Sequence, residues 1–79
     1  MKISACMITK NEEENIERCI NSYKDIVSEI IVVDTGSIDS TVKIAQKLGA
    51  KVYFFKWIND FAAARNFALS KAECDWIIF

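Results

Sequence analysis

Four consecutive branched apolar residues at positions 30–33 lead directly into a polar turn, residues 34–41, and no other feature constrains the fold as strongly. An uninterrupted apolar run predicts a strand that is covered on both faces, as in the parallel sheet of an α/β domain. The turn contains two carboxylates, Asp34 and Asp39, and several hydroxyl groups that suit the start of a helix. Asp34 therefore stands at the carboxyl end of a buried strand, where open parallel sheets have their binding crevice.

Strands and helices alternate along the chain, without a repeat or a low-complexity linker. The periodicity predicts the order β-α-β-α-β-α-β, with strands at residues 3–9, 29–34, 51–55 and 75–79. Linkers of only a few residues favour right-handed crossovers and a mostly parallel sheet with helices on both faces. We expect a Rossmann-like, three-layer α/β/α fold in which about four strands lie in the order 3-2-1-4.

Capping residues bound the three predicted helices. The first helix would run to about residue 24, and Gly49 would end the second as a C′ glycine. The candidate N-caps are Asn11 for the first helix, Ser37 or Asp39 for the second, and Asp60 for the third. The side chains expected to face the sheet are Ile16, Cys19, Ile20 and Tyr23, then Val42, Ala45 and Leu48, then Phe61, Ala64, Ala68 and Leu69.

The composition excludes several classes of partner. Ten basic and eleven acidic residues leave a formal charge of -1, which provides no electrostatic footprint for nucleic acid or an anionic membrane. The apolar start of the chain is too short to span a membrane, and it lacks the cleavage pattern of a signal peptide. We expect no nucleic-acid partner, no membrane contact from this segment, and a location in the cytoplasm or at the cytosolic face of a membrane.

The last residues form an apolar run, 76–79, with no turn or polar tail after it. An edge strand that lacks a partner on its outer side promotes pairing with another chain. We therefore expect residues 1–79 to form a single partial domain of a longer protein, and the isolated segment to self-associate.

The turn after the first predicted strand disfavours the common nucleotide-binding loops. It has no glycine, and it carries Glu12, Glu13 and Glu14, which would repel a phosphate from the start of the following helix. This chemistry disfavours NAD and FAD sites, and the chain has no Walker-type motif. A receiver domain is also disfavoured, because residues 53–57 contain no phospho-acceptor aspartate after the third strand. Any bound phosphate needs other support, such as a metal ion and carboxylates.

The residues alone leave alternatives open at each candidate position. Asp34 could accept a hydrogen bond from a ribose hydroxyl or a base N–H, or it could cap the backbone of its own turn. Asp39 fits a helix cap better than a ligand contact. Arg65 could be a surface arginine paired with a carboxylate, and Lys10 could be a solvated surface charge.

Three ordered segments together resemble the amino-terminal half of a family 2 glycosyltransferase. They are ISACMITKNEE at residues 3–13, IVVDTGSIDST at residues 31–41 and FAAARN at residues 61–66. The similarity extends over essentially the whole chain. It implies the nucleotide-binding half of a GT-A fold, truncated, from a bacterial enzyme that glycosylates a saccharide, lipid or peptide acceptor.

The resemblance also implies a nucleotide-sugar site across the carboxyl ends of the first two strands. Thr9 and Asn11 would line the nucleoside pocket, Asp34 would hydrogen-bond the base, and Arg65 would approach the base or the phosphates. A UDP-sugar is the expected donor. No catalytic residue and no metal ligand is expected within the chain, because the family's Asp-x-Asp motif and general base would follow Phe79.

The full-length protein is accordingly expected to be an inverting glycosyltransferase that uses Mg²⁺ or Mn²⁺. The segment itself is expected to be inactive. The alternative is a non-catalytic α/β module that binds a nucleotide or regulates a partner.

Overall fold

The computed structural model describes residues 2–74 and 76–78 and has the predicted alternation of strands and helices. Asp75 and Phe79, the two ends of the fourth predicted strand, lie outside the described residues. The elements are β1 (Ile3–Thr9), α1 (Ile16–Tyr23), β2 (Glu29–Asp34), α2 (Thr41–Lys47), β3 (Lys51–Phe54), α3 (Phe61–Lys71) and β4 (Trp76–Ile78).

The four strands form one parallel sheet in the order β3-β2-β1-β4, which confirms the predicted topology. The register pairs Thr9 with Asp34 and Asp34 with Phe54, so three strands end level with one another. Trp76–Ile78, the described residues of β4, pair with Ile3–Ala5 of β1. The carboxyl half of β1 therefore extends past β4. On the side away from β2, no described strand pairs with this half of β1.

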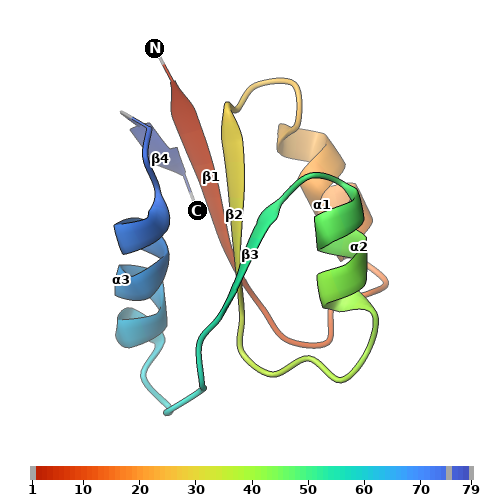
Figure 1. The fold of residues 1–79 in the computed structure, drawn as a ribbon, viewed down its shortest axis with the longest axis vertical. Helices are drawn as coiled ribbons and strands as arrows, with labels where there is room; N and C mark the ends of the chain where they lie inside the picture. The colour runs from red at the N-terminus through yellow and green to blue at the C-terminus, as the bar shows by residue number, and fades with distance from the viewer. Residues whose placement is uncertain (1, 75, 79) are drawn as a thin grey trace.

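Both faces of the sheet are covered, because successive residues of β2 point to opposite sides. Ile30 and Val32 pack in a core with α1 and α2, whereas Ile31 and Val33 pack in a second core with Ala68 of α3. Figure 1 shows α1 and α2 on one side of the sheet and α3 on the other. The predicted three-layer α/β/α architecture is confirmed.

Helix α1 begins later than predicted, at Ile16 with Asn15 in the N-cap position. Asn11 is not the cap. Its backbone has a φ of 52°, in the left-handed region that asparagine tolerates better than most residues. The three glutamates belong to a separate turn, in which the N–H groups of Asn15 and Ile16 donate to the carbonyl of Glu12.

Helix α2 begins at Thr41, with Ser40 in the N-cap position and Asp39 as the capping side chain. Asp39 Oδ1 accepts from the N–H of Thr41 at 2.9 Å, so this carboxylate bonds to the start of the helix, but, contrary to the prediction, neither Ser37 nor Asp39 occupies the N-cap position. Gly49 follows the helix with a φ of +91°, as predicted for a C′ glycine. Val42 is only partly buried, and Ile44 packs against the core in its place.

Helix α3 has the predicted cap, since Asp60 Oδ1 accepts from the N–H of Ala63 at 3.1 Å. Ala64 and Ala68 are fully buried, and their small side chains face the sheet. The prediction that Phe61 and Leu69 face inward is wrong, because both are exposed. Phe67 fills that face of the sheet, with its ring centroid 5.1 Å from that of Phe55. No helix within residues 2–74 is long and apolar enough to cross a membrane.

Candidate functional site

A pocket of about 240 Å³ lies at the level carboxyl ends of β1 and β2. Its residues come from the end of β1, from the loops after β1, β2 and β3, and from the first residue of α3, which the parallel topology brings to one edge of the sheet. This is where open α/β sheets bind ligands. The lining residues are Ile8, Thr9, Lys10, Glu12, Thr35, Trp57 and Phe61.

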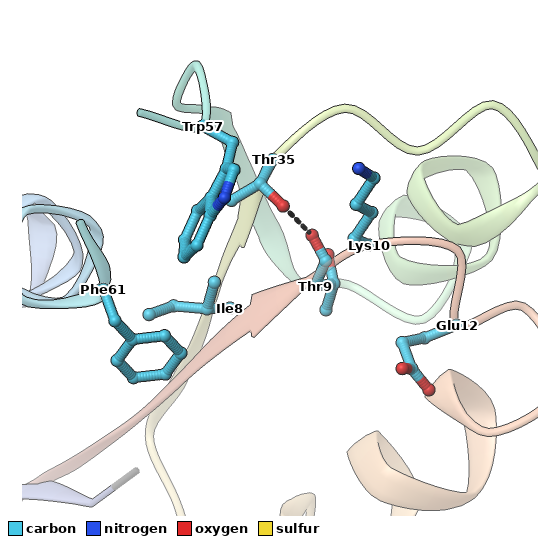
Figure 2. Close-up of a pocket in the computed structure, with 7 residues that line it drawn as sticks. All are labelled: Ile8, Thr9, Lys10, Glu12, Thr35, Trp57 and Phe61. Atoms are coloured by element: carbon cyan, nitrogen blue, oxygen red, sulfur yellow. Dashed lines mark hydrogen bonds between the residues drawn. The ribbon is translucent and has the colours of Figure 1, made fainter. Parts of the chain in front are cut away.

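The pocket has two chemically unlike sides, which Figure 2 shows together. Trp57 and Phe61 lie on one side, where their rings make an edge-to-face contact with centroids 6.3 Å apart. Lys10 and Glu12 lie on the other side. A ligand in this pocket would therefore meet an aromatic wall on one flank and charged groups on the other.

Two threonines connect the strand ends beneath the pocket. The hydroxyl of Thr35 donates to the carbonyl oxygen of Thr9 at 2.9 Å, shown as a dashed line in Figure 2. The N–H of Thr35 donates to the same carbonyl, also at 2.9 Å. The hydroxyl of Thr35 has thus used its proton within the protein, and it offers only acceptor lone pairs to a ligand.

Asp34 lies next to the pocket without lining it, and its carboxylate accepts all its hydrogen bonds from groups of the protein. Oδ2 accepts from the N–H groups of Gly36 at 3.1 Å and Ser37 at 2.8 Å. Oδ1 accepts from the hydroxyl of Thr9 at 3.0 Å and from that of Ser37. A carboxylate has about four lone-pair sites, so these four donors saturate it.

The electrostatics of Asp34 agree with a buried, fully bonded carboxylate. Asp34 is only 3% exposed, and burial alone would raise the pKa of its carboxyl group. The hydrogen bonds from Ser37, Gly36 and Thr9 outweigh that effect and hold the pKa below its usual value. Asp34 is therefore ionised at neutral pH, and its charge fixes the turn after β2 in place.

Asn11 joins the turn after β1 to the turn after β2. Its N–H donates to Ser37 Oγ at 2.8 Å, and its Oδ1 accepts from the N–H of Ile38 at 2.9 Å. The left-handed backbone at Asn11 allows both groups to reach across together. Asn11 does not line the pocket; it ties the turn that carries Lys10 and Glu12 to the turn after β2.

The glutamates of the first turn strengthen the same junction. The N–H of Glu12 donates to Thr41 Oγ1 at 2.8 Å, and Glu13 accepts from the N–H of Ser40 at 3.1 Å. The N–H of Glu13 also donates to Asp39 at 3.3 Å. The acidic run thus ties the turn after β1 to the start of α2 and does not form the first turn of a long α1.

Arg65 lies on α3 next to the pocket and not in it. Its guanidinium is 5.4 Å from the ring centroid of Phe61. It lines an adjoining hollow of about 260 Å³ along the open side of β1, which shares Ile8 and Phe61 with the main pocket. A ligand that extends from one hollow to the other would contact Ile8 and Phe61, which line both.

The structure therefore separates the four predicted site residues. Thr9 lines the pocket, Asn11 and Asp34 stand behind it, and Arg65 borders the neighbouring hollow. Sequence reasoning missed Thr35 and Trp57 and assigned no role to Lys10. The signal for Trp57 was available: in a 3-2-1-4 sheet the loop after the third strand ends at the same edge as Asp34, and an aromatic residue there faces the crevice.

The parallel sheet in the order β3-β2-β1-β4, with helices on both faces, is an α/β fold of the GT-A type. The sequence model of glycosyl transferase family 2 matches residues 4–79, and the chain belongs to this family.

Two of the three curated relatives described below are named glycosyltransferases. An uncharacterized glycosyltransferase of Rickettsia felis is 52% identical over 77 residues, and the alignment covers 98% of this chain and 27% of the relative. The SPbeta prophage-derived glycosyltransferase SunS of Bacillus subtilis is 40% identical over 79 residues, covering 98% and 19%. A TPR repeat-containing protein of Synechococcus elongatus is 49% identical over 77 residues, again covering 98% and 19%.

The fold is also similar to that of a solved enzyme. Glucosyl-3-phosphoglycerate synthase from Mycobacterium tuberculosis, in complex with Mn²⁺, UDP-glucose and phosphoglyceric acid, matches with a TM-score of 0.84 and 29% identity. The match covers 99% of this chain and 32% of the synthase. The chain thus spans about a fifth to a quarter of the curated relatives it matches and about a third of this synthase.

Proposed function

We propose that residues 1–79 form one partial domain, the nucleotide-binding part of a glycosyltransferase that uses a nucleotide sugar. The observation that carries the proposal is the pocket at the carboxyl ends of β1 and β2, with an aromatic wall and a lysine on opposite sides. Family membership supports a sugar-transfer reaction. The UDP-glucose bound by the mycobacterial synthase favours UDP as the carrier.

The size of the pocket favours the nucleoside as its occupant. At about 240 Å³ it is smaller than the roughly 300–1,000 Å³ of pockets that enclose a whole drug-sized ligand. We place the nucleoside in this pocket, and the diphosphate and sugar toward the adjoining hollows and residues beyond 79.

The side chains divide into contact and support roles in this proposal. Thr9 and Lys10 contact the nucleotide, and Arg65 approaches the base or the phosphates from α3. Asn11 remains a predicted member of the nucleoside site, and its bonds to Ser37 and Ile38 favour support over direct contact. The predicted contact between Asp34 and the base is less favoured than a supporting role, because the four acceptor sites of Asp34 are already used.

A divalent metal fits the proposed reaction, but the described residues of this segment do not form a site for one. Among residues 2–74 and 76–78, no three histidine, cysteine, aspartate or glutamate side chains are grouped to hold a metal ion. Glu12 is the one carboxylate that lines the pocket. We therefore propose that the ligands for Mg²⁺ or Mn²⁺ belong to the part of the full-length protein that follows residue 79.

The reaction proposed for the full-length protein is a single displacement with inversion. An acceptor hydroxyl oxygen forms a bond to the anomeric carbon, while the bond from that carbon to the nucleoside diphosphate breaks. The hydroxyl proton passes to a general base, which we also place after residue 79. The segment itself holds the nucleoside and is inactive alone.

Two further expectations belong to the proposal. Self-association of the isolated segment is supported by the exposed side chains of Trp76 and Ile77 on the edge strand β4. A cytoplasmic location is supported by the three free cysteines, Cys6, Cys19 and Cys74.

Calorimetric titration of the full-length protein with UDP and Mn²⁺ tests the proposed function. We expect saturable binding, which Lys10→Ala weakens roughly fivefold to tenfold, because the variant removes a cation that faces the pocket. Lys24→Ala is the matched control, since it removes the same charge from an exposed residue just after α1, away from the pocket. Absence of UDP binding to the unmodified protein would refute the proposal.

A further inference from the structure

The aromatic wall of the pocket is held in one orientation by its own loop. Trp57 precedes α3, and its indole N–H donates to Asn59 Oδ1 at 3.0 Å. Its ring and that of Phe61 make an edge-to-face contact at an interplanar angle of 75°. Because both contacts fix the ring, the indole is oriented before any ligand binds. This preorganisation lowers the entropic cost of binding.

The backbone of this loop is shaped for that contact. Asn59 has a φ of 57°, a conformation that asparagine adopts more readily than most residues. The turn folds the amide of Asn59 back onto the indole of Trp57, two residues earlier. Asn59 therefore combines a backbone role with a side-chain role in positioning the ring.

The indole remains available to a ligand. Trp57 is 38% exposed although it lines the pocket, and Figure 2 shows its ring beside the pocket, above Ile8 and next to Thr35. A flat aromatic surface with an acceptor oxygen beside it suits a planar ring that carries an N–H donor at its edge. Nucleobases have this chemistry, and they stack on aromatic side chains whatever their identity.

We propose that the indole of Trp57 is the stacking surface for the nucleobase of the donor, with Asn59 as its positioning residue. The inference rests on the proposed function, since it assigns the base to one wall of the proposed nucleoside pocket. Stacking supplies affinity for the base. The acceptor lone pairs of Thr35 then favour an edge with an N–H group, such as that of uracil.

Binding of UDP to variants of the full-length protein tests this role. Trp57→Ala is expected to raise the Kd for UDP by about 5- to 100-fold, the range that loss of one base–aromatic stack produces. Trp57→Phe keeps a flat ring and should stay within about threefold of the unmodified protein. Ile58→Ala is the matched control, because Ile58 belongs to the same loop, is 57% exposed and does not line the pocket.

Two more readouts separate stacking from a structural effect. Inorganic pyrophosphate has no base, so its binding should be the same in Trp57→Ala as in the unmodified protein. Asn59→Gly keeps the left-handed backbone but frees the indole, and it should weaken UDP binding by an intermediate factor. The indole of Trp57 should report UDP binding through its fluorescence, so Trp57→Phe should reduce the UDP-dependent fluorescence change, whereas Trp76→Phe should leave that contribution in place.

The outcomes distinguish this inference from the proposed function. If the unmodified protein binds UDP and Trp57→Ala binds it within twofold, the stacking role is wrong and the nucleotide site stands. Equal losses of UDP and pyrophosphate affinity would also overturn the stacking role. If Trp57→Ala does not fold, the Trp57→Phe fluorescence and the Asn59→Gly affinity decide the question. Failure of the unmodified protein to bind UDP would overturn both proposals.

Discussion

Asp34→Ala is expected to lower the free energy of unfolding by about 3 kcal/mol, because it removes the acceptor for four donors at a buried turn. The N–H groups of Gly36 and Ser37 cannot turn away, so they would lose their partners outright. Chemical denaturation of the full-length protein and the variant at pH 7 measures the difference.

Asp34→Asn is the informative control for that loss. An amide placed with its oxygen toward Gly36 and Ser37 still accepts from both N–H groups, and the hydroxyls of Thr9 and Ser37 can rotate to accept from the new NH₂. We expect a loss of only about 1 kcal/mol from the missing charge. An asparagine variant as unstable as the alanine variant would contradict this account of the turn.

The same pair of variants tests whether Asp34 contacts the base. A supporting residue predicts that Asp34→Asn keeps the UDP affinity within about threefold, since the geometry of the pocket is preserved. Direct recognition of the base predicts a large loss, because the new NH₂ would face an N–H donor of the base. The second result would restore the contact predicted from the sequence.

Glu29 lies at the amino-terminal ends of the strands, opposite the end that carries Asp34. Glu29→Ala is expected to lower the free energy of unfolding by about 2–3 kcal/mol at pH 7. The side chain of Glu29 is 9% exposed, and it accepts from Lys51 Nζ at 3.1 Å and from the N–H of Glu73 at 2.7 Å. It also accepts from the hydroxyl of Ser4. One carboxylate thus joins the starts of β1, β2 and β3 to the residues before β4.

The pH dependence of the Glu29 effect has a defined sign. The hydrogen bond from Ser4, followed by those from Glu73 and Lys51, lowers the pKa of Glu29 from 4.5 to about 2 against the opposing effect of burial. A carboxyl group with a lowered folded-state pKa stabilises fully above its unfolded pKa, and the contribution is lost as the pH falls from about 5 toward 2. Denaturation of protein and variant at pH 7 and pH 3 should show the difference shrinking at pH 3. A difference that stays constant would contradict the assignment.

The fold could be predicted from the sequence because its strongest signals are local and agree with one another. Residues 30–33 must be covered on both faces, and the short linkers allow few topologies other than 3-2-1-4. Asp60 and Gly49 bound their helices as predicted, since each makes its contact within its own turn. Local chemistry was sufficient wherever the partner of a residue lies nearby in the chain.

Predictions were wrong where the partner of a residue lies far away in the chain. Asn11 has the local pattern of an N-cap, but it binds Ile38 instead, 27 residues later. Phe61 has the spacing of a core residue in α3, yet it is exposed and lines the pocket. Neither outcome is visible until the loops after β1, β2 and β3 are placed side by side.

Hydrogen exchange of the full-length protein, with and without UDP and Mn²⁺, tests the central claim most directly. The pocket predicts slower exchange on UDP binding in three turns at one edge of the sheet, residues 10–13, 35–38 and 57–60. Residues 24–28 and 48–50 lie in turns at the opposite edge and should exchange at unchanged rates. Protection confined to that opposite edge, or absent from all three turns of the pocket, would contradict the account.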